Sequence, residues 1–294
     1  MITYHSYKSQ EENIFSIIIP TWNNLSYIKL CVESIRKNST YKHQIILHIN
    51  DGSDGTVEWA KASGLSYTYS PENVGICKAC NAAFTLASAD YILYMNDDMY
   101  ACPDWDKNLF QAIEEYGKDD FYFSGTMIEH KVTTNTCVTK TAYFGDSPEN
   151  FKEADLLQQY KSLERSDWQG GCWPPSVMHR KYWNLIGGFS IELSPGMYSD
   201  PDIAMKLWMA GCRNYRGIGN SLVYHFMSKS TQKVKKNNGR KQFVMKWGMT
   251  AGFFYKNYIS LGHEYKGLAE DPENEPGFKK KFFLAKIKAK FKSL

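Results

Sequence analysis

The sequence lacks long hydrophobic runs and a regular cysteine framework. No apolar segment approaches the roughly 20 residues that a helix needs to span a bilayer, and residues 1–13 are polar, without the apolar segment of a signal peptide. The seven cysteines are odd in number and irregularly spaced, a pattern typical of reduced thiols and not of a disulfide framework. We therefore expect a cytoplasmic protein without a transmembrane helix.

Zinc-type ligand spacing is also missing. Cys77 and Cys80 form one Cys-x-x-Cys pair, but no second pair and no histidine pair at ligand spacing accompanies it. Because the pair falls inside a helical pattern, we interpret both thiols as packing groups.

A strong charge of one sign is missing as well, since the net charge is only +4. Hydrophobic residues make up 43% of the chain, enough for a sizeable core in one large α/β domain or two smaller ones.

The stretch Tyr91–Asp98 is a short apolar strand that ends in one amide and two carboxylates. Burying carboxylates without partners is costly, so these side chains must meet water, a cation or a polar ligand. In open α/β sheets the carboxyl end of a strand is where ligands bind. The oxygens of Asn96, Asp97 and Asp98 suit Mg²⁺ or Mn²⁺. A simple turn is the alternative, since Asn and Asp favour turns.

Strands and helices alternate through the first hundred residues. Apolar strands are expected at 15–20, 44–49 and 66–70, and helices at 25–38, 57–62 and 76–87. This rhythm predicts a parallel sheet with right-handed crossovers. The ends of its strands would bring Thr21–Asn23, Asp51–Asp54 and Asn96–Asp98 to one edge of the sheet.

Four segments carry a resemblance to family 2 glycosyltransferases of the GT-A fold: Ser16–Asn23, Asn50–Thr56, Asn73–Asn81 and Tyr91–Asp98. Each motif is loose by itself, and it is their shared order and spacing that carries the resemblance, which continues to about residue 230. The resemblance implies an α/β fold with a Rossmann-like, mostly parallel sheet flanked by helices and a C-terminal helical extension. It also implies a nucleotide-diphospho-sugar donor, here expected to be a UDP-sugar, a Mn²⁺ or Mg²⁺ ion, and inversion at the anomeric carbon.

Carried over position by position, the resemblance implies a nucleotide-sugar site in the first half of the chain. Its expected members are Pro20, Thr21, Asn23, Asp51, Asn73, Gly75, Lys78, Asn81, Asn96 and Asp97. Asp51 matches the family aspartate that binds the nucleotide base, while Lys78 and Asn81 match residues that face the diphosphate and ribose. Simple solvation is the alternative for Lys78. Asn96 replaces the first aspartate of the family's metal motif, so Asp98 is the expected metal carboxylate.

The second half of the chain is expected to supply the acceptor side and the base. Asp200 matches the family's general base, which takes the proton from the acceptor hydroxyl as that oxygen attacks the sugar. Ser199 stands where the family has a glutamate, and Asp202 is both the fallback base and an expected acceptor residue. His225 is expected as the second metal ligand, with a structural role as the alternative. The other expected acceptor residues are Trp168, Gly170, Gly171 and Trp173, with a place in the core as the alternative for the two tryptophans.

We divide the chain into five parts. Residues 1–13 are an N-terminal extension, and residues 14–230 are a catalytic domain with a nucleotide-sugar-binding half (14–100) and an acceptor-binding half (101–230). A loop and helical extension (231–267), a linker (268–277) and a tail (278–294) follow. The tail has seven lysines, no acidic residue and six large apolar residues at helical spacing. This is the pattern of an amphipathic helix on an anionic membrane, so we expect a peripheral protein at the cytoplasmic face. A nucleic acid is the rival partner, and the apolar face argues against it; a solvated tail is the plain alternative.

These features favour an inverting, metal-dependent glycosyltransferase that acts on a glycan or lipid-linked acceptor in cell-surface polysaccharide biosynthesis. One alternative is a sugar-phosphate nucleotidyltransferase, whose Gly-rich, Arg-containing loop is missing after the first strand. The other is a non-catalytic sugar- or nucleotide-binding module, for which Asn96 and Ser199 are the two signs.

Overall fold

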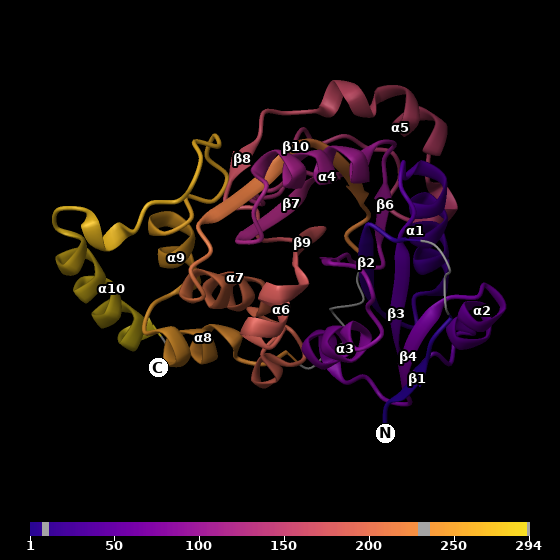
Figure 1. The fold of residues 1–294 in the computed structure, drawn as a ribbon, viewed down its shortest axis with the longest axis horizontal. Helices are drawn as coiled ribbons and strands as arrows, with labels where there is room; N and C mark the ends of the chain where they lie inside the picture. The colour runs from indigo at the N-terminus through magenta and orange to yellow at the C-terminus, as the bar shows by residue number, and fades with distance from the viewer. Residues whose placement is uncertain (8–11, 229–235, 293–294) are drawn as a thin grey trace.

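A single mixed β-sheet forms the centre of the computed structural model, which describes residues 1–7, 12–228 and 236–292 (Figure 1). Its strands are β1 (Thr3–His5), β2 (Phe15–Trp22), β3 (Gln44–Asn50), β4 (Ser66–Ser70), β5 (Tyr91–Tyr94), β6 (Met99–Ala101), β7 (Phe121–Glu129), β8 (Trp168–Gln169), β9 (Ser176–His179) and β10 (Asn214–His225). They are ordered β1-β4-β3-β2-β5-β9-β7-β10-β6, and β8 pairs with β10.

Helices cover both faces of this sheet (Figure 1). They are α1 (Leu25–Asn38), α2 (Thr56–Ala62), α3 (Gly75–Phe84), α4 (Trp105–Tyr116), α5 (Glu153–Gln159), α6 (Arg180–Ile186), α7 (Ser199–Met209), α8 (Gly239–Trp247), α9 (Ala251–Asn257) and α10 (Phe278–Lys292). Short 3₁₀ turns are η1 (Pro148–Asn150), η2 (Tyr160–Leu163), η3 (Ile191–Leu193) and η5 (Pro272–Asn274). Among the described residues, no helix combines the length and the apolar character needed to cross a membrane.

The predicted parallel half of the sheet is confirmed. Strand β2 runs parallel to β3 and β5, and β3 runs parallel to β4. Ile17 and Ile19 of β2 pack into one core cluster and Ile18 into another, so the strand is buried on both faces. This explains its continuous apolar run. Strand β9 lies antiparallel between β5 and β7, which joins this half to the parallel pair β7 and β10.

Several elements differ from the sequence-based expectation. Strand β1, inside the predicted N-terminal extension, pairs with β4 at the sheet edge. Strand β10 and helix α5 lie beyond the strands and helices that the sequence predicts. Two glycines in the first half of β10 allow other chain segments to approach closely, since a Cβ on Gly217 would meet the Trp168 ring and one on Gly219 would meet the Arg165 carbonyl.

The predicted loop and helical extension (231–267) contains two helices, α8 and α9, because Gly248 adopts the left-handed conformation (φ 68°) that ends α8. Its first five residues, 231–235, lie outside the described residues. Cys77 and Cys80 are fully buried in the core, as the packing interpretation predicts.

Candidate active site

A cavity of about 520 Å³ opens at the carboxyl ends of β2, β3 and β5. The parallel strands bring their ends to this edge, as the sequence predicts. The sequence-predicted residues that line the cavity are Pro20, Thr21, Asn73, Gly75, Asn96, Asp97, Asp98, Asp200 and His225. A smaller cavity of about 280 Å³ lies where β3 and β4 begin, and none of the described residues that line it is a carboxylate. The larger cavity is therefore the candidate site.

Asp97 and Asp98 place two neighbouring carboxylates on the cavity wall. Burial, reinforced by the charge of Asp98, raises the pKa of Asp97 to about 7. Thr21 Oγ1 donates a hydrogen bond of 2.7 Å to Asp97 Oδ2. Burial would also raise the pKa of Asp98, but the charge and hydrogen bond of His225, together with Ser228, lower it overall. Asp98 is therefore the ionised member of the pair at neutral pH.

His225 links Asp98 to Glu129, a residue that the sequence reasoning missed. His225 Nε2 lies 3.5 Å from Asp98 Oδ2, and Nδ1 lies 3.0 Å from Glu129 Oε1. Burial would lower the pKa of His225, but these two carboxylates raise it to about 10. Glu129 thus fixes the ring so that Nε2 faces Asp98. The sequence contains a pattern that identifies Glu129. It is a polar residue at the end of a buried strand, as Asn96 is a polar residue just after β5.

The donor set suits a hard cation that shares its coordination with a ligand. In the described part of the chain, no group of three His, Cys, Asp or Glu side chains could hold a metal alone. Mg²⁺ and Mn²⁺ sites commonly use one or two protein ligands and complete their shell with phosphates and water. Asp98, and His225 oriented by a carboxylate, fit such a shared site.

Asp200 occupies the first turn of α7 and also lines the cavity. The side chain is half-buried, and its removal from bulk water raises the pKa to about 7. Among the described residues, no hydrogen-bond or ion-pair partner holds this carboxylate. A carboxylate with a pKa near 7 and no competing partner can accept a proton at neutral pH.

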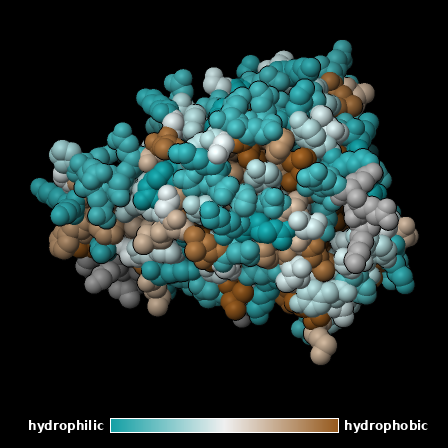
Figure 2. All heavy atoms as spheres, viewed as in Figure 1, coloured by the Kyte–Doolittle hydropathy of each residue, from teal (hydrophilic) through white to brown (hydrophobic). Residues whose placement is uncertain are grey.

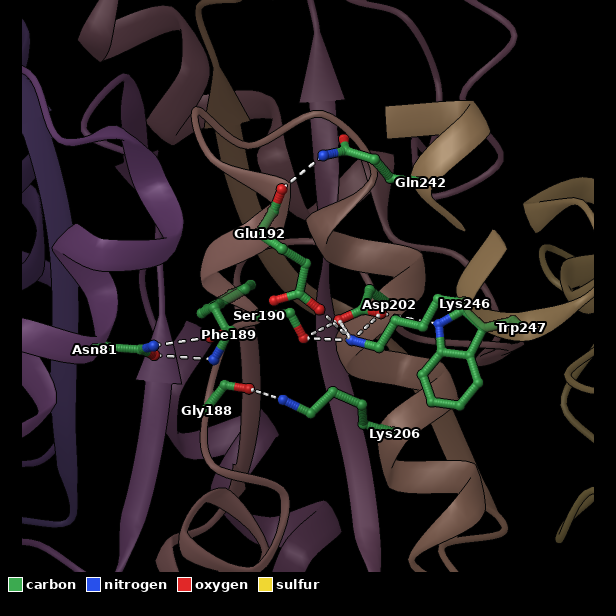
Figure 3. A network of polar contacts seen from close by, with 10 residues as sticks. All are labelled: Asn81, Gly188, Phe189, Ser190, Glu192, Asp202, Lys206, Gln242, Lys246 and Trp247. Atoms are coloured by element: carbon green, nitrogen blue, oxygen red, sulfur yellow. Dashed lines mark hydrogen bonds and ion pairs between the residues drawn. The ribbon is translucent and has the colours of Figure 1, made fainter. Parts of the chain in front are cut away.

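Asp202 does not face the cavity, which corrects its two predicted roles as fallback base and acceptor residue. Its side chain is 1% exposed. Its carboxylate binds Ser190, Lys246 and Trp247 (Figure 3). A carboxylate enclosed by its own chain cannot contact an acceptor sugar.

Asn81 and Lys78 on α3 do not line the cavity either. Asn81 donates to the Phe189 carbonyl at 2.8 Å and accepts from the Phe189 amide at 2.9 Å, so its amide group is occupied by backbone. The expected ribose contact of Asn81 is therefore wrong in this structure. Lys78 is exposed, in agreement with the solvated alternative.

The predicted acceptor residues of the Trp168–Trp173 segment belong to the packing of the protein. Trp168 is fully buried and donates from Nε1 to Thr126 Oγ1 at 2.8 Å, so it cannot stack on a sugar. A Cβ on Gly170 would meet the Leu261 backbone, and one on Gly171 the Arg216 backbone. These two glycines thus allow other segments of the same chain to pack closely against them. Trp173 is half-buried and donates to the Tyr255 hydroxyl at 3.2 Å.

Asn23 and Asp51 lie at the strand ends beside the cavity, next to the lining residues Trp22 and Asn50. Asn23 Nδ2 donates to Asp51 Oδ2 at 2.8 Å, and this hydrogen bond is the main cause that lowers the pKa of Asp51. Lining residues that the sequence reasoning did not name include Trp22, Asn50, Tyr94, Lys131 and Lys236.

The family described as glycosyl transferase family 2 matches residues 16–182, which is more than half of the chain. Glycosyltransferase GlyA of Streptococcus pneumoniae is 28% identical over 109 residues, covering 35% of this chain and 16% of that protein. Putative glycosyltransferase EpsH of Bacillus subtilis is 28% identical over 102 residues, covering 33% of this chain and 29% of that protein. The chain therefore matches under a third of the length of each of these curated relatives.

Solved structures of S. aureus TarS share the fold. The crystal structure of TarS residues 1–349 has a TM-score of 0.53 and 15% identity, covering 72% of this chain and 60% of that chain. The same fragment in complex with UDP-GlcNAc has a TM-score of 0.52 and 17% identity, covering 73% of this chain and 60% of that chain. At this identity the likeness establishes the fold.

We predict that Glu129→Gln lowers the pKa of His225 by about one pH unit or more, because it removes one of the two anions that stabilise the imidazolium. NMR titration of the histidine ring signals measures this. The matched control is Asp119→Asn, which removes a carboxylate 3.7 Å from a different histidine, His179. An unchanged pKa of His225 in Glu129→Gln would contradict the assigned link.

Proposed function

This chain belongs to glycosyl transferase family 2 and has the GT-A fold, and on that premise we propose that it transfers a sugar from a nucleotide-diphospho-sugar to an acceptor hydroxyl with inversion. One observation carries the proposal. Asp200, whose pKa is about 7 and which has no hydrogen-bond or ion-pair partner among the described residues, lines the same cavity as the Asp97–Asp98 pair. The family match favours transfer over the nucleotidyltransferase alternative.

The proposed step needs a base that takes the proton from the acceptor hydroxyl and positive charge near the diphosphate that leaves. The acceptor oxygen bonds to the anomeric carbon while the bond from that carbon to the diphosphate oxygen breaks. The acceptor proton passes to Asp200, and the electron pair of the broken bond leaves with the nucleotide diphosphate. Lys131 and Lys236 line the same cavity and supply positive charge toward that leaving group.

A UDP-sugar is the proposed donor, and Mg²⁺ or Mn²⁺ the proposed cation. A solved TarS fragment of the same fold is a complex with UDP-GlcNAc, which supports a uridine nucleotide here. Asp98 and His225 would hold the cation, which when bound stabilises the negative charge of the diphosphate. Because the pKa of His225 is raised to about 10, binding through Nε2 would release a proton.

The proposed acceptor is a glycan or lipid-linked sugar, with α10 resting on an anionic membrane at the cytoplasmic face. The structure changes the expected contact surface. Phe278 is 2% exposed, and its ring packs against Phe253 and Phe282. The exposed apolar residues of α10 are Phe283, Leu284 and Ile287, and apolar atoms are visible over α10 in Figure 2. Phe291 and Leu294, also expected on this face, lie outside the described side chains.

We predict that Asp200→Asn lowers kcat by about 10² or more, because the amide cannot accept the acceptor proton. In the unmodified protein kcat should rise with pH through about 7, since the base acts only when ionised, and this rise should vanish in the variant. Donor affinity should be unchanged. Full activity in Asp200→Asn would contradict the base assignment, whereas donor binding without transfer by the unmodified protein would favour a binding module.

We predict that Phe283→Ser/Leu284→Ser/Ile287→Ser weakens sedimentation of the protein with anionic vesicles. Each lysine near such a surface contributes about 1 kcal/mol, so high salt should weaken binding too. The control, Leu185→Ser/Met209→Ser, removes exposed apolar residues elsewhere and should bind normally. Equal binding by all three proteins would show that the exposed apolar residues of α10 do not contact the membrane.

A further inference from the structure

A polar network around the buried Asp202 carboxylate joins α7 to α8 and to the turn η3 (Figure 3). Asp202 of α7 is at its centre. Its Oδ1 accepts a hydrogen bond of 2.8 Å from Trp247 Nε1 and lies 3.0 Å from Lys246 Nζ. Its Oδ2 accepts one of 2.5 Å from Ser190 Oγ. Both oxygens of this buried carboxylate are therefore bound by side chains from outside α7.

Helix α8 and the residues just before it also bind the segment that leads into α7, residues 192–197. Lys246 Nζ also lies 2.9 Å from Glu192 Oε1, and Gln242 Nε2 donates to the Glu192 carbonyl at 2.7 Å. Asn237, just before α8, accepts from the Met197 amide at 3.1 Å. Met197 lines the cavity, so α8 and Asn237, two residues before it, contact the cavity wall through the segment 192–197.

The backbone just before α7 adopts an unfavourable conformation, and packing contacts with α8 stabilise it. Tyr198 has a φ of 74°, a left-handed conformation that bulky residues seldom adopt unless their surroundings determine it. The first residue of α8, Gly239, packs so closely that a Cβ there would lie 2.1 Å from the Met197 carbonyl oxygen. The Tyr198 ring lies 6.1 Å from that of Phe243 in α8. Asp200 follows two residues after this supported position.

We propose that α8 positions the general base: Lys246 and Trp247 bind Asp202, and so fix the first turn of α7 in the rotation that directs Asp200 into the cavity. This proposal rests on the proposed function, in which Asp200 is the base. Residues two apart on a helix point in different directions, so one turn can anchor Asp202 on one side and present Asp200 on another. Neither Lys246 nor Trp247 lines the cavity, so both are positioning residues.

Removing the Lys246 ammonium would leave the buried Asp202 carboxylate with two hydrogen bonds and, among the described residues, no ion pair, with only the charge of Lys206 still acting on it. Such a group draws in water or takes up a proton, and either change moves the helix turn that carries it. A displacement of about 1 Å at a reacting group can cost on the order of 10²-fold in rate. The predicted damage is thus to the chemical step and not to donor binding.

The pH dependence separates positioning from a merely structural role. Among the described residues, the titratable groups whose pKa the charge of Asp200 raises are Cys77, Cys80, Tyr94, Tyr122, Cys137, Cys172 and Tyr255. Burial raises the pKa of each of them further, so all are uncharged at neutral pH. Within the described part of the chain, burial is therefore the cause that raises the pKa of Asp200. A loosened turn that admits water should move the rise of kcat to lower pH.

The test compares kcat, KM for UDP-GlcNAc and pH profiles of variants of the full chain. Lys246→Met should lower kcat by about 10-fold or more, leave KM for the donor within about twofold, and move the rise of kcat to lower pH. Lys246→Arg, which can bridge the same two carboxylates, should restore most of the activity. Lys241→Met is the matched control, because Lys241 is an exposed lysine of the same helix and should behave like the unmodified protein.

Trp247→Phe provides a second variant that keeps most of the ring volume and deletes one hydrogen bond to Asp202. It should lower kcat without changing donor KM. Unchanged kcat and pH profile in both variants would overturn the positioning role, as would a parallel loss of donor binding that Lys246→Arg does not restore. Full activity in Asp200→Asn would instead mean that the proposed function has failed.

Discussion

Three carboxylates share one cavity at the carboxyl edge of the sheet, and the free energy of removing their charges from water constrains the groups around them. The surroundings of the three carboxylates shift their pKa values in different directions. His225 and Ser228 keep Asp98 ionised, whereas burial raises the pKa values of Asp97 and Asp200 to about 7. A ligand with its own negative charge can enter such a cavity only with positive partners. For the proposed diphosphate, the lysines on the cavity wall would meet part of that need and the proposed cation the rest.

The half of the site built on parallel strands could be predicted from the sequence. Continuous apolar runs identify strands buried on both faces, and the polar residues that end those runs mark the edge where they meet. The hydrogen bond between Thr21 and Asp97 joins residues 76 positions apart, as that geometry requires. Asp98 and His225, placed by resemblance, also meet at 3.5 Å.

The other half could not be predicted, because side chains that look functional are satisfied by partners far along the chain. Asn81 is bound by the backbone of Phe189, and Asp202 by Lys246, contacts that no local pattern encodes. Trp168 shows the same effect, since its ring is enclosed against the glycine-rich part of β10. A polar or aromatic residue near a motif therefore indicates a site only after its packing partners are known.

Calorimetric titration of UDP into the unmodified protein and Asp98→Ala, with and without Mn²⁺, tests the central claim most directly. If the carboxylates at the sheet edge bind a nucleotide diphosphate through a cation, the unmodified protein should bind UDP more tightly with Mn²⁺ than without it. Asp98→Ala should lose that gain, because it removes the ionised carboxylate of the Asp97–Asp98 pair. Equal affinity in all four titrations would contradict the account.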